Sequence, residues 1–383
     1  MELTHILQKQ IKKIIDFIKA EVVLTVAVFL AVVSMFFVAP SAAYAGYMNW
    51  HVLSLLLCLM LVMEGLKQLG VFSTIAAVLM RKVKAFSQVV FILVFLCFFS
   101  SMFITNDVAL ITFVPFAVEV LKMAGKEKKM IAVIVLQTIA ANLGSMLTPI
   151  GNPQNLYLYS YAGFTLLRFL GIMAPACLVS FLLLFVSCLW ITKGETMDDI
   201  SFPAIRYWTK KRIVLTALYV ILFFISILVV ADVFSFKAAL AITLPVVFFV
   251  DRKTLRSVDY CLLLTFCGFF VFVGNMGNIQ SIASLLEGWM QGREFLVSVL
   301  TSQVISNVPA ALLLSGFTKD IPALLLGVNI GGLGTLIASM ASLISYKAFA
   351  KAYPKQKGRY MVYFSVMNLA YLAVFVFGYF LFY

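Results

Sequence analysis

The stretch FITNDVALITFVPF, residues 103–116, places Thr105, Asn106 and Asp107 inside a segment that is otherwise apolar enough to lie in lipid. The apolar segment runs over residues 86–121 and would be about 54 Å long as one helix. A bilayer core is only ~30 Å thick, so the segment must cross twice or enter and turn back. A second apolar segment, 295–317, is interrupted in the same way by SNVP at 306–309. We therefore predict two helical hairpins.

Composition places the rest of the chain in a membrane as well. Of its 383 residues 63% are hydrophobic and 12% are charged, and the mean hydropathy is +1.06, which excludes a soluble domain. The net charge of +13 does not indicate nucleic-acid binding, because the basic residues form short clusters between apolar runs. Further helical segments are predicted near residues 22–39, 50–66, 130–160, 165–191, 212–231, 236–250, 259–276, 321–346 and 360–382.

Positive charges fix the predicted orientation. If both hairpins return to their starting side and the N-terminus is cytoplasmic, all but four of the 29 lysines and arginines are cytoplasmic. The four exceptions are Arg168, Lys237, Arg293 and Lys319. This strong asymmetry favours the hairpins over single crossings. The first hairpin then opens to the cytoplasm and the second to the opposite side, so the two halves have inverted orientations.

An internal repeat accompanies this inversion. ANLGSMLTPIGNPQNLYLYSY (141–161) aligns without gaps on VNIGGLGTLIASMASLISYKA (328–348) and matches Asn142 with Asn329, Gly144 with Gly331 and Thr148 with Thr335. Three apolar or aromatic positions are also identical. The hairpin sequences FITNDVAL (103–110) and VISNVPAA (304–311) likewise share an asparagine. We interpret the chain as two inverted repeats, each with a re-entrant hairpin and a broken helix.

The four polar interruptions are expected to converge. Irregular backbone survives at membrane depth only where it is buried in protein or lines a wet cavity. Side chains at the hairpin tips are predicted to cap the returning helices, whose N-termini favour an anion, while amide oxygens and the Asp107 carboxylate favour a cation. Gly144, Gly151, Gly331 and Gly332, with Gly334, are expected to permit unusual dihedral angles and close approach to a ligand.

Simpler interpretations exist for each of these residues. The glycines could serve close helix packing, Asn142 and Asn329 an interhelical hydrogen bond, and Asp107 only a helix cap. A carboxylate at the bilayer centre is costly and usually marks an ion path, which favours a functional role for Asp107. Glu64 and Glu119 fall near the predicted cytoplasmic ends of their segments, where a solvated role is expected.

The same motifs resemble a known family. TNDVALITFVPF, ANLGSMLTPIGNPQN, ISNVPAALLLSGF and VNIGGLGTLIASMASLI are similar to the signatures of the ion transporter superfamily, which includes divalent-anion/sodium symporters, citrate transporters, arsenite permeases and some sodium/proton antiporters. In that family both hairpin tips carry Ser-Asn-Thr motifs that bind sodium and a substrate carboxylate. The third position differs in both tips here, as Asp107 and Val308, and Asp107 is similar to the arsenite-permease side. The resemblance implies a homodimer with a static scaffold and an elevator-like transport domain.

These features predict a secondary active transporter of the cytoplasmic membrane that moves a small anion or oxyanion, carboxylate- or arsenite-like, coupled to sodium or protons. The alternative is a sodium/proton antiporter with Asp107 as the exchanging carboxylate. An enzyme is disfavoured because no nucleophile with a basic partner and no metal cluster lies at depth, and a channel because no rings of charge line a pore. No cofactor besides the coupling ion is expected. The predicted partners are a small anionic substrate, the lipid bilayer and a second copy of the chain.

The predicted organisation is an amphipathic cytoplasmic N-terminus (1–21), a first inverted repeat (22–192, hairpin 86–121, broken helix 130–160), a cytoplasmic loop with a linking helix (193–235) and a second inverted repeat (236–383, hairpin 295–317, broken helix 321–346), with about nine full spans beside the hairpins. Sodium is expected at Asn106, Asp107 and Asn307. The predicted substrate- and ion-binding residues are Thr105, Asn106, Asp107, Asn142, Gly144, Thr148, Gly151, Asn152, Asn155, Ser306, Asn307, Asn329, Gly331, Gly332, Thr335 and Ser339.

Overall fold

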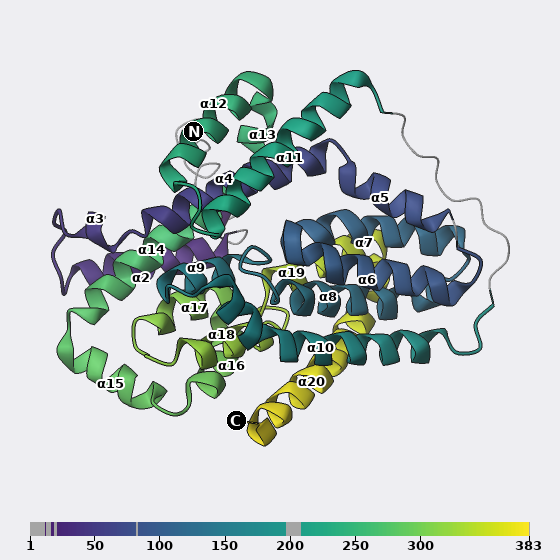
Figure 1. The fold of residues 1–383 in the computed structure, drawn as a ribbon. Helices are drawn as coiled ribbons and strands as arrows, with labels where there is room; N and C mark the ends of the chain where they lie inside the picture. The colour runs from purple at the N-terminus through teal and green to yellow at the C-terminus, as the bar shows by residue number, and fades with distance from the viewer. Residues whose placement is uncertain (1–11, 13–16, 19–20, 82, 197–207, 383) are drawn as a thin grey trace, which may run out of the picture.

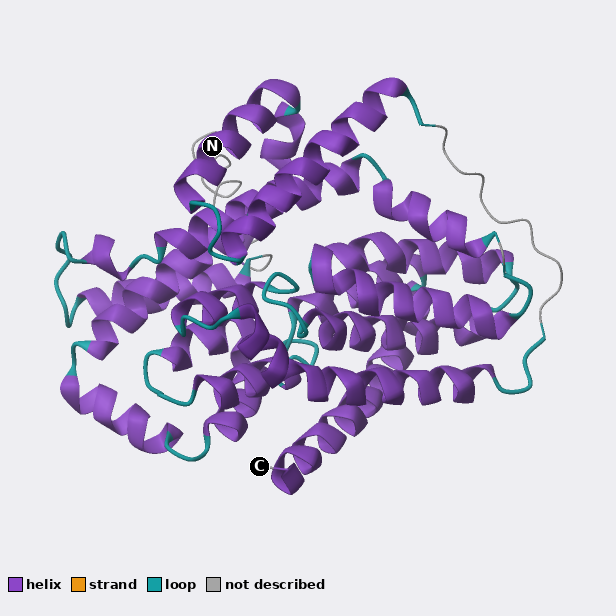
Figure 2. Ribbon diagram, in the orientation of Figure 1, coloured by secondary structure: helices purple, strands orange, loops and turns teal. Residues whose placement is uncertain are grey.

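The chain folds into helices joined by short loops (Figure 2). The computed structural model describes residues 12, 17, 18, 21–81, 83–196 and 208–382, and these contain no strand. The predicted all-α class is therefore confirmed. Most of the predicted N-terminal segment 1–21, and residues 197–207 of the predicted loop 193–235, lie outside the described residues.

The helices follow one another in the order shown in Figure 1. They are α2 (Val22–Met35), α3 (Tyr44–Tyr47), α4 (Trp50–Gln68), α5 (Val71–Met80), α6 (Phe86–Ile104), α7 (Asn106–Met123), η1 (Glu127–Lys129), α8 (Met130–Ser145), α9 (Pro153–Tyr161), α10 (Leu166–Thr192), α11 (Lys210–Val230), α12 (Phe236–Val250), α13 (Arg252–Ser257), α14 (Tyr260–Gly277), α15 (Gln280–Met290), α16 (Glu294–Ile305), α17 (Asn307–Ser315), α18 (Ile321–Ile330), α19 (Met340–Ala352), η2 (Pro354–Gln356) and α20 (Lys357–Phe382).

Six helical segments in the described part of the chain are long and apolar enough to cross a membrane. These are α4, α6, α10, α11, α14 and the C-terminal segment Pro354–Leu381. Five further apolar helices, α2, α5, α12, α16 and α18, have only 10–17 residues. The protein is therefore a polytopic membrane protein. The predicted segment 22–39 is shorter than expected, since α2 ends at Met35, and α5 and α15 were not predicted as helices.

Both predicted hairpins are interrupted at their polar residues. The first bends between α6 and α7 at Thr105, and the second between α16 and α17 at Ser306. The predicted broken helices are interrupted as well, because the seven residues 146–152 separate α8 from α9, and residues 331–339 separate α18 from α19. The polar residues in otherwise apolar runs thus mark the helix breaks.

Local capping explains where several helices begin. The side chains of Asn49, Asn152, Thr165, Asp259 and Asp320 each accept a hydrogen bond from the backbone N–H three residues further on. Such caps satisfy donors that the first helical turn leaves unpaired. They fix the starts of α9, α14 and α18, which lie around the helix breaks.

The helices around the breaks form two interlocked bundles (Figure 1). Helices α6, α7 and α8 pack together, and α16, α17 and α18 pack together in the same way. The second part of each broken helix packs on the other bundle, because α9 contacts α17 and α18 while α19 contacts α7 and α8. Helix α4 contacts α7, α9 and α14, so it lies along the junction of the bundles.

Candidate functional site

The two hairpin tips share one unusual backbone conformation. Thr105 has φ 68° and ψ 150°, and Ser306 has φ 77° and ψ 156°, a region that side chains rarely adopt. In each tip the next residue, Asn106 or Asn307, accepts a hydrogen bond of 3.0 Å on its side-chain oxygen from the backbone N–H that follows it. Of the tip side chains predicted to cap the returning helices, Asn106 and Asn307 thus make a local contact to the first turn, whereas those of Thr105 and Ser306 do not cap α7 and α17.

Each tip is also bound to the break in its own repeat. The backbone N–H of Asn106 donates to the carbonyl of Gly151 at 3.2 Å, and that of Asn307 donates to the carbonyl of Ala338 at 3.0 Å. Gly151 and Ala338 occupy equivalent positions in the aligned repeat sequences. Equivalent backbone hydrogen bonds therefore join the hairpin tip to the helix break in both repeats.

A second pair of equivalent bonds lies beside the first. The hydroxyl of Thr148 donates to the carbonyl of Met102, and the hydroxyl of Thr335 donates to the carbonyl of Gln303 at 3.0 Å. Thr148 and Thr335 are identical in the repeat alignment. Each threonine thus holds the last turn before a hairpin tip against the neighbouring break.

Asn142 lies where both halves meet. Its Oδ1 accepts hydrogen bonds from Asn106 Nδ2 at 3.1 Å and from Ser339 Oγ at 2.9 Å, and its Nδ2 donates to the Gly332 carbonyl at 3.4 Å. Asn142 and Asn106 are 4% and 5% exposed. One buried amide therefore joins the first hairpin, the first broken helix and the break of the second.

Asn329, the counterpart of Asn142, shares one equivalent contact with it and has others of its own. Its Oδ1 accepts from Asn152 Nδ2 at 3.0 Å, and its Nδ2 donates to Asn155 Oδ1 at 2.6 Å. Asn152 and Ser339 are equivalent in the repeat, so the Asn142–Ser339 and Asn329–Asn152 contacts correspond. Asn155 also donates to carbonyls of the break between α8 and α9, including that of Ser145 at 3.3 Å. Asn106 bonds to Asn142, and Asn329 bonds to both Asn152 and Asn155; these five residues form the asparagine cluster. Asn307 bonds to its own tip and to the Ala338 carbonyl, and within the described residues to no other asparagine.

The glycines mostly serve close packing, as the simpler interpretation held. A Cβ on Gly144 would collide with the backbone oxygen of Phe98, and one on Gly151 would collide with the Ser145 carbonyl. Gly331 is similarly crowded, and Gly332 lies next to the Asn307 amide. Of the five glycines singled out from the sequence, Gly334 has a positive φ (106°), and Gly144, Gly151, Gly331 and Gly332 do not.

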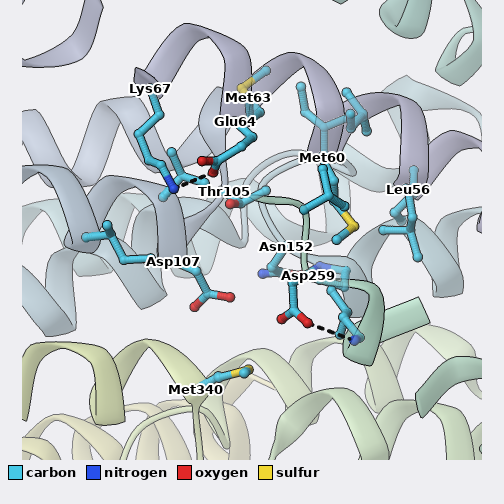
Figure 3. A pocket seen from close by; sticks show the side chains of 18 of the residues that line it. Leu56, Met60, Met63, Glu64, Lys67, Thr105, Asp107, Asn152, Asp259 and Met340 are labelled. Atoms are coloured by element: carbon cyan, nitrogen blue, oxygen red, sulfur yellow. Dashed lines mark hydrogen bonds and ion pairs between the residues drawn. The ribbon is translucent and has the colours of Figure 1, made fainter. Parts of the chain in front are cut away.

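A cavity of about 320 Å³ opens beside this asparagine cluster (Figure 3). Of the predicted site residues, Thr105, Asp107 and Asn152 line it. Sequence reasoning missed its other polar lining residues, among them Glu64 and Lys67 on α4 and Asp259 before α14. The remaining lining side chains are Leu56, Leu59, Met60, Met63, Val108, Ile111, Ile150, Pro153, Leu156, Ser257, Val258, Leu262, Met340 and Ile344.

Asp107 points into this cavity and does not cap α7 (Figure 3). Its Oδ1 is buried and has no hydrogen-bond partner among the described residues. The expectation that its carboxylate caps the returning helix was therefore wrong, since Asn106 makes that contact. A buried carboxylate oxygen without a donor requires a proton, a cation or water as compensation.

Glu64 and Lys67 form an ion pair at the wall of the cavity, and Glu64 Oε1 also accepts from Gln68 Nε2 at 2.9 Å. A solvated role was expected for Glu64. Its side chain is only 13% exposed, and it faces the cavity in Figure 3. Position near a helix end was the only available signal, and it does not distinguish bulk water from a cavity.

A cluster of charges ties the loop after the first hairpin to the end of α10. Lys126 Nζ and Lys129 Nζ contact the two carboxylate oxygens of Glu195 at 2.6 and 3.1 Å. The hydrogen bond from Lys126 and then that from Lys129 lower the pKa of Glu195 below its ordinary value. This cluster lies at the end of the first bundle, away from the cavity.

Comparison with known proteins follows this geometry. The family CitMHS, described as citrate transporter, matches residues 11–321 of the chain. The chain belongs to this citrate transporter family. Its resemblance to the ion transporter superfamily is thereby confirmed.

Relatives of this family member are described as an inner membrane protein and as transporters. The inner membrane protein YbiR of Escherichia coli is 29% identical over 82% of this chain and 84% of its own length. An uncharacterised transporter of Methanocaldococcus jannaschii is 31% identical over 78% of this chain and 81% of its own. A putative transporter, arsB, of Dictyostelium discoideum is 29% identical over 32% of this chain and 21% of its own. The protein is a membrane transporter by family.

Proposed function

We propose that this family member is a secondary active transporter that moves a small anion or oxyanion, coupled to sodium or protons. The observation that carries the proposal is the meeting of the first hairpin tip and both helix breaks at one buried asparagine cluster beside a cavity, with the second tip bonded to its own break at Ala338. Broken helices and tips at such a junction are the usual setting for substrate and ion sites in transporters built from repeats. The citrate transporter description of the family makes a carboxylate the first substrate to test.

The two halves are proposed to be inverted repeats with re-entrant hairpins. Supporting this are the matched tip bonds of Asn106 and Asn307, the matched threonine bonds and the exchange of α9 and α19 between the bundles. The distribution of lysine and arginine favours a cytoplasmic N-terminus in the cytoplasmic membrane. We further propose a homodimer in which the bundles move as a transport domain past a scaffold that includes α4.

The contacts suggest which residues bind the cation, which favour the anion and which support the site. Asn106, Asn307 and Asp107 are proposed to contribute to sodium binding, because amide and carboxylate oxygens suit a hard cation. The N-termini of α7 and α17 are proposed to favour the anion. Thr105, Asn142, Asn152, Asn155, Asn329 and Ser339, with Thr148, Thr335 and Ser306, are proposed to line or support the site, and Gly144, Gly151, Gly331 and Gly332 to allow the close packing around it.

A second function is favoured by one specific observation. The unpartnered oxygen of Asp107 lies in a cavity whose lining carries three carboxylates and one lysine, which is a poor environment for an anion. In a sodium/proton antiporter Asp107 would exchange a proton for sodium, and no anion would bind. This remains the alternative.

Proteoliposome transport separates the two functions. Uptake of labelled citrate, sulfate and arsenite is measured under imposed sodium or pH gradients, beside sodium-driven proton movement without an anion. The proposal expects gradient-driven uptake of at least one anion, at least tenfold lower in Asp107→Asn. Glu119→Gln, which removes an exposed charge from the same helix, serves as the matched control. Sodium/proton exchange with no anion uptake would contradict the proposal and support the antiporter.

A further inference from the structure

The cavity brings together two carboxylates from separate elements. Asp107 lies in the first turn of α7, and Asp259 directly precedes α14. Figure 3 shows both carboxyl groups turned toward the same space, and both residues line the one cavity. Asp259 Oδ1 accepts from the backbone N–H of Leu262 at 3.2 Å, which holds this carboxylate in place.

The other charged groups around the cavity do not neutralise this pair. Lys67 is engaged by Glu64 in the ion pair on α4. The residues of α19 that line the cavity are the apolar Met340 and Ile344. The break between α8 and α9 and the first turn of α9 contribute only neutral residues, which are Ile150, Asn152, Pro153 and Leu156. Within the described residues no ion pair involves Asp107 or Asp259. Asp259 is exposed, whereas Asp107 is half-buried and its Oδ1 is fully buried, so two carboxylates at this cavity lack an ion-pair partner within the described residues.

We propose that Asp259 is the second carboxylate of the cation site that begins with Asp107, and that one monovalent cation is held between them. The unpartnered, buried Oδ1 of Asp107 gives that cation a ligand that nothing else in the described chain occupies. Within the described residues, no three His, Cys, Asp or Glu side chains are grouped so that they could hold a metal ion together. Amide oxygens such as that of Asn152, which also lines the cavity, and water would complete the oxygen ligands of the cation.

Asp259 thereby becomes a residue that determines coupling. Asp107 belongs to the hairpin α6–α7, whereas Asp259 belongs to the connection between α13 and α14. If α14 belongs with α4 to the scaffold of the proposed transport function, on which this step rests, the two carboxylates separate when the hairpin moves. Both carboxylates then hold the cation only in the conformation seen here, so cation binding stabilises this conformation relative to the one in which the hairpin has moved.

Thermal unfolding of the purified full-length protein, without substrate, tests the site. Sodium chloride is titrated against choline chloride at constant ionic strength, and the same series is repeated from pH 5 to pH 9. If sodium is the cation, it should raise the melting temperature of the wild type by about 3 °C or more at saturation. Asp259→Asn should need at least tenfold more sodium for half of that rise, whereas Glu119→Gln should match the wild type.

The amide of Asp259→Asn can still accept from Leu262, so the cap of α14 is kept and a folding defect is not expected. Asp259→Glu, which restores the charge, should recover part of the sodium response. If the cation is a proton, sodium has no effect on the wild type, and Asp259→Asn instead weakens the pH dependence of its melting temperature. Equal sodium and pH responses in Asp259→Asn and wild type would overturn the role of Asp259.

The same variants in proteoliposomes separate this inference from the transport function. Coupled anion uptake that is unchanged in Asp259→Asn would overturn the role of Asp259 and leave the transporter standing. A cation response that depends on Asp259, in a protein that takes up no anion under any gradient, would support the cation site and contradict anion transport.

Discussion

Replacing Asn142 by alanine removes the acceptor shared by the first hairpin and the second break. Asn106 Nδ2 and Ser339 Oγ, both buried, would lose the oxygen to which they now donate at 3.1 and 2.9 Å. A buried donor without an acceptor costs about 1–3 kcal/mol, but side-chain hydrogen bonds between membrane helices average only ~0.6 kcal/mol. For two bonds we therefore expect Asn142→Ala to lower the free energy of unfolding by about 1–4 kcal/mol.

The matched control is Asn368→Ala. Asn368 is equally buried, but it donates only to the Phe364 carbonyl of its own helix α20, and its oxygen has no partner within the described residues. Its replacement should cost less than about 1 kcal/mol. Equilibrium unfolding of purified protein in bicelles measures both variants. A double-mutant cycle with Asn106→Ala should show a coupling energy of about 0.5–1.5 kcal/mol, because both single changes remove the same bond.

Two results would refute this reasoning. One is an Asn142→Ala protein whose stability matches the wild type within about 0.5 kcal/mol, the usual scatter for a neutral change. The other is strict additivity of Asn106→Ala and Asn142→Ala. Either would mean that the amides face a ligand or water instead of each other, and the cluster would then be a site without a structural role.

Three more predictions concern other parts of the molecule. Gly144→Ala should destabilise the protein by about 1–3 kcal/mol or prevent folding, because the added Cβ would collide with the backbone of Phe98. Gly171→Ala on α10, where the added Cβ would meet open space, should leave stability unchanged, and thermal unfolding compares the two variants. Cysteines replacing Lys128 and Lys319 should react with membrane-impermeant reagents from the cytoplasmic and the external side respectively, and labelling of both from one side would contradict the inverted halves. Folding lowers the pKa of Glu195, so its ionised carboxylate stabilises the protein fully above the pKa of the unfolded state, and this stabilisation is lost as the pH falls through the pKa of the folded state. Glu195→Gln should therefore make the free energy of unfolding depend less on pH between neutral and acidic pH, which unfolding measured across this range would show.

The helix breaks were predictable because polar residues are expensive in hydrocarbon. Asn106 and Asn307 interrupt apolar runs, and the chain bends at the residue before each of them. The matching asparagines Asn142 and Asn329 predicted that the two breaks resemble each other. In the structure their hydrogen bonds to Ser339 and to Asn152 occupy equivalent positions. Local sequence is informative at these positions because an unpaired backbone group at membrane depth has few alternatives.

The charged wall of the cavity could not be predicted in this way. Glu64, Lys67 and Asp259 look like solvated charges near helix ends, and nothing in their neighbours along the chain indicates that α4 and α14 converge on the first hairpin. That convergence depends on packing between distant helices. Asp107 was recognised because a carboxylate in an apolar run is unusual by itself, but its direction, into the cavity and away from a capping role, required the tip geometry set by Asn106.

The backbone at Thr105 and Ser306 bears on how far this protein could be stabilised. Their φ angles of 68° and 77° fall where glycine is comfortable and side chains cost about 1–3 kcal/mol each. A chain optimised for robustness alone would carry glycine at both positions. It carries a hydroxyl at both instead, and the one on Thr105 belongs to the cavity wall. If these hydroxyls serve the proposed site, glycine at either position would raise thermal stability and lower transport activity, so a version stabilised for structural work would trade one for the other.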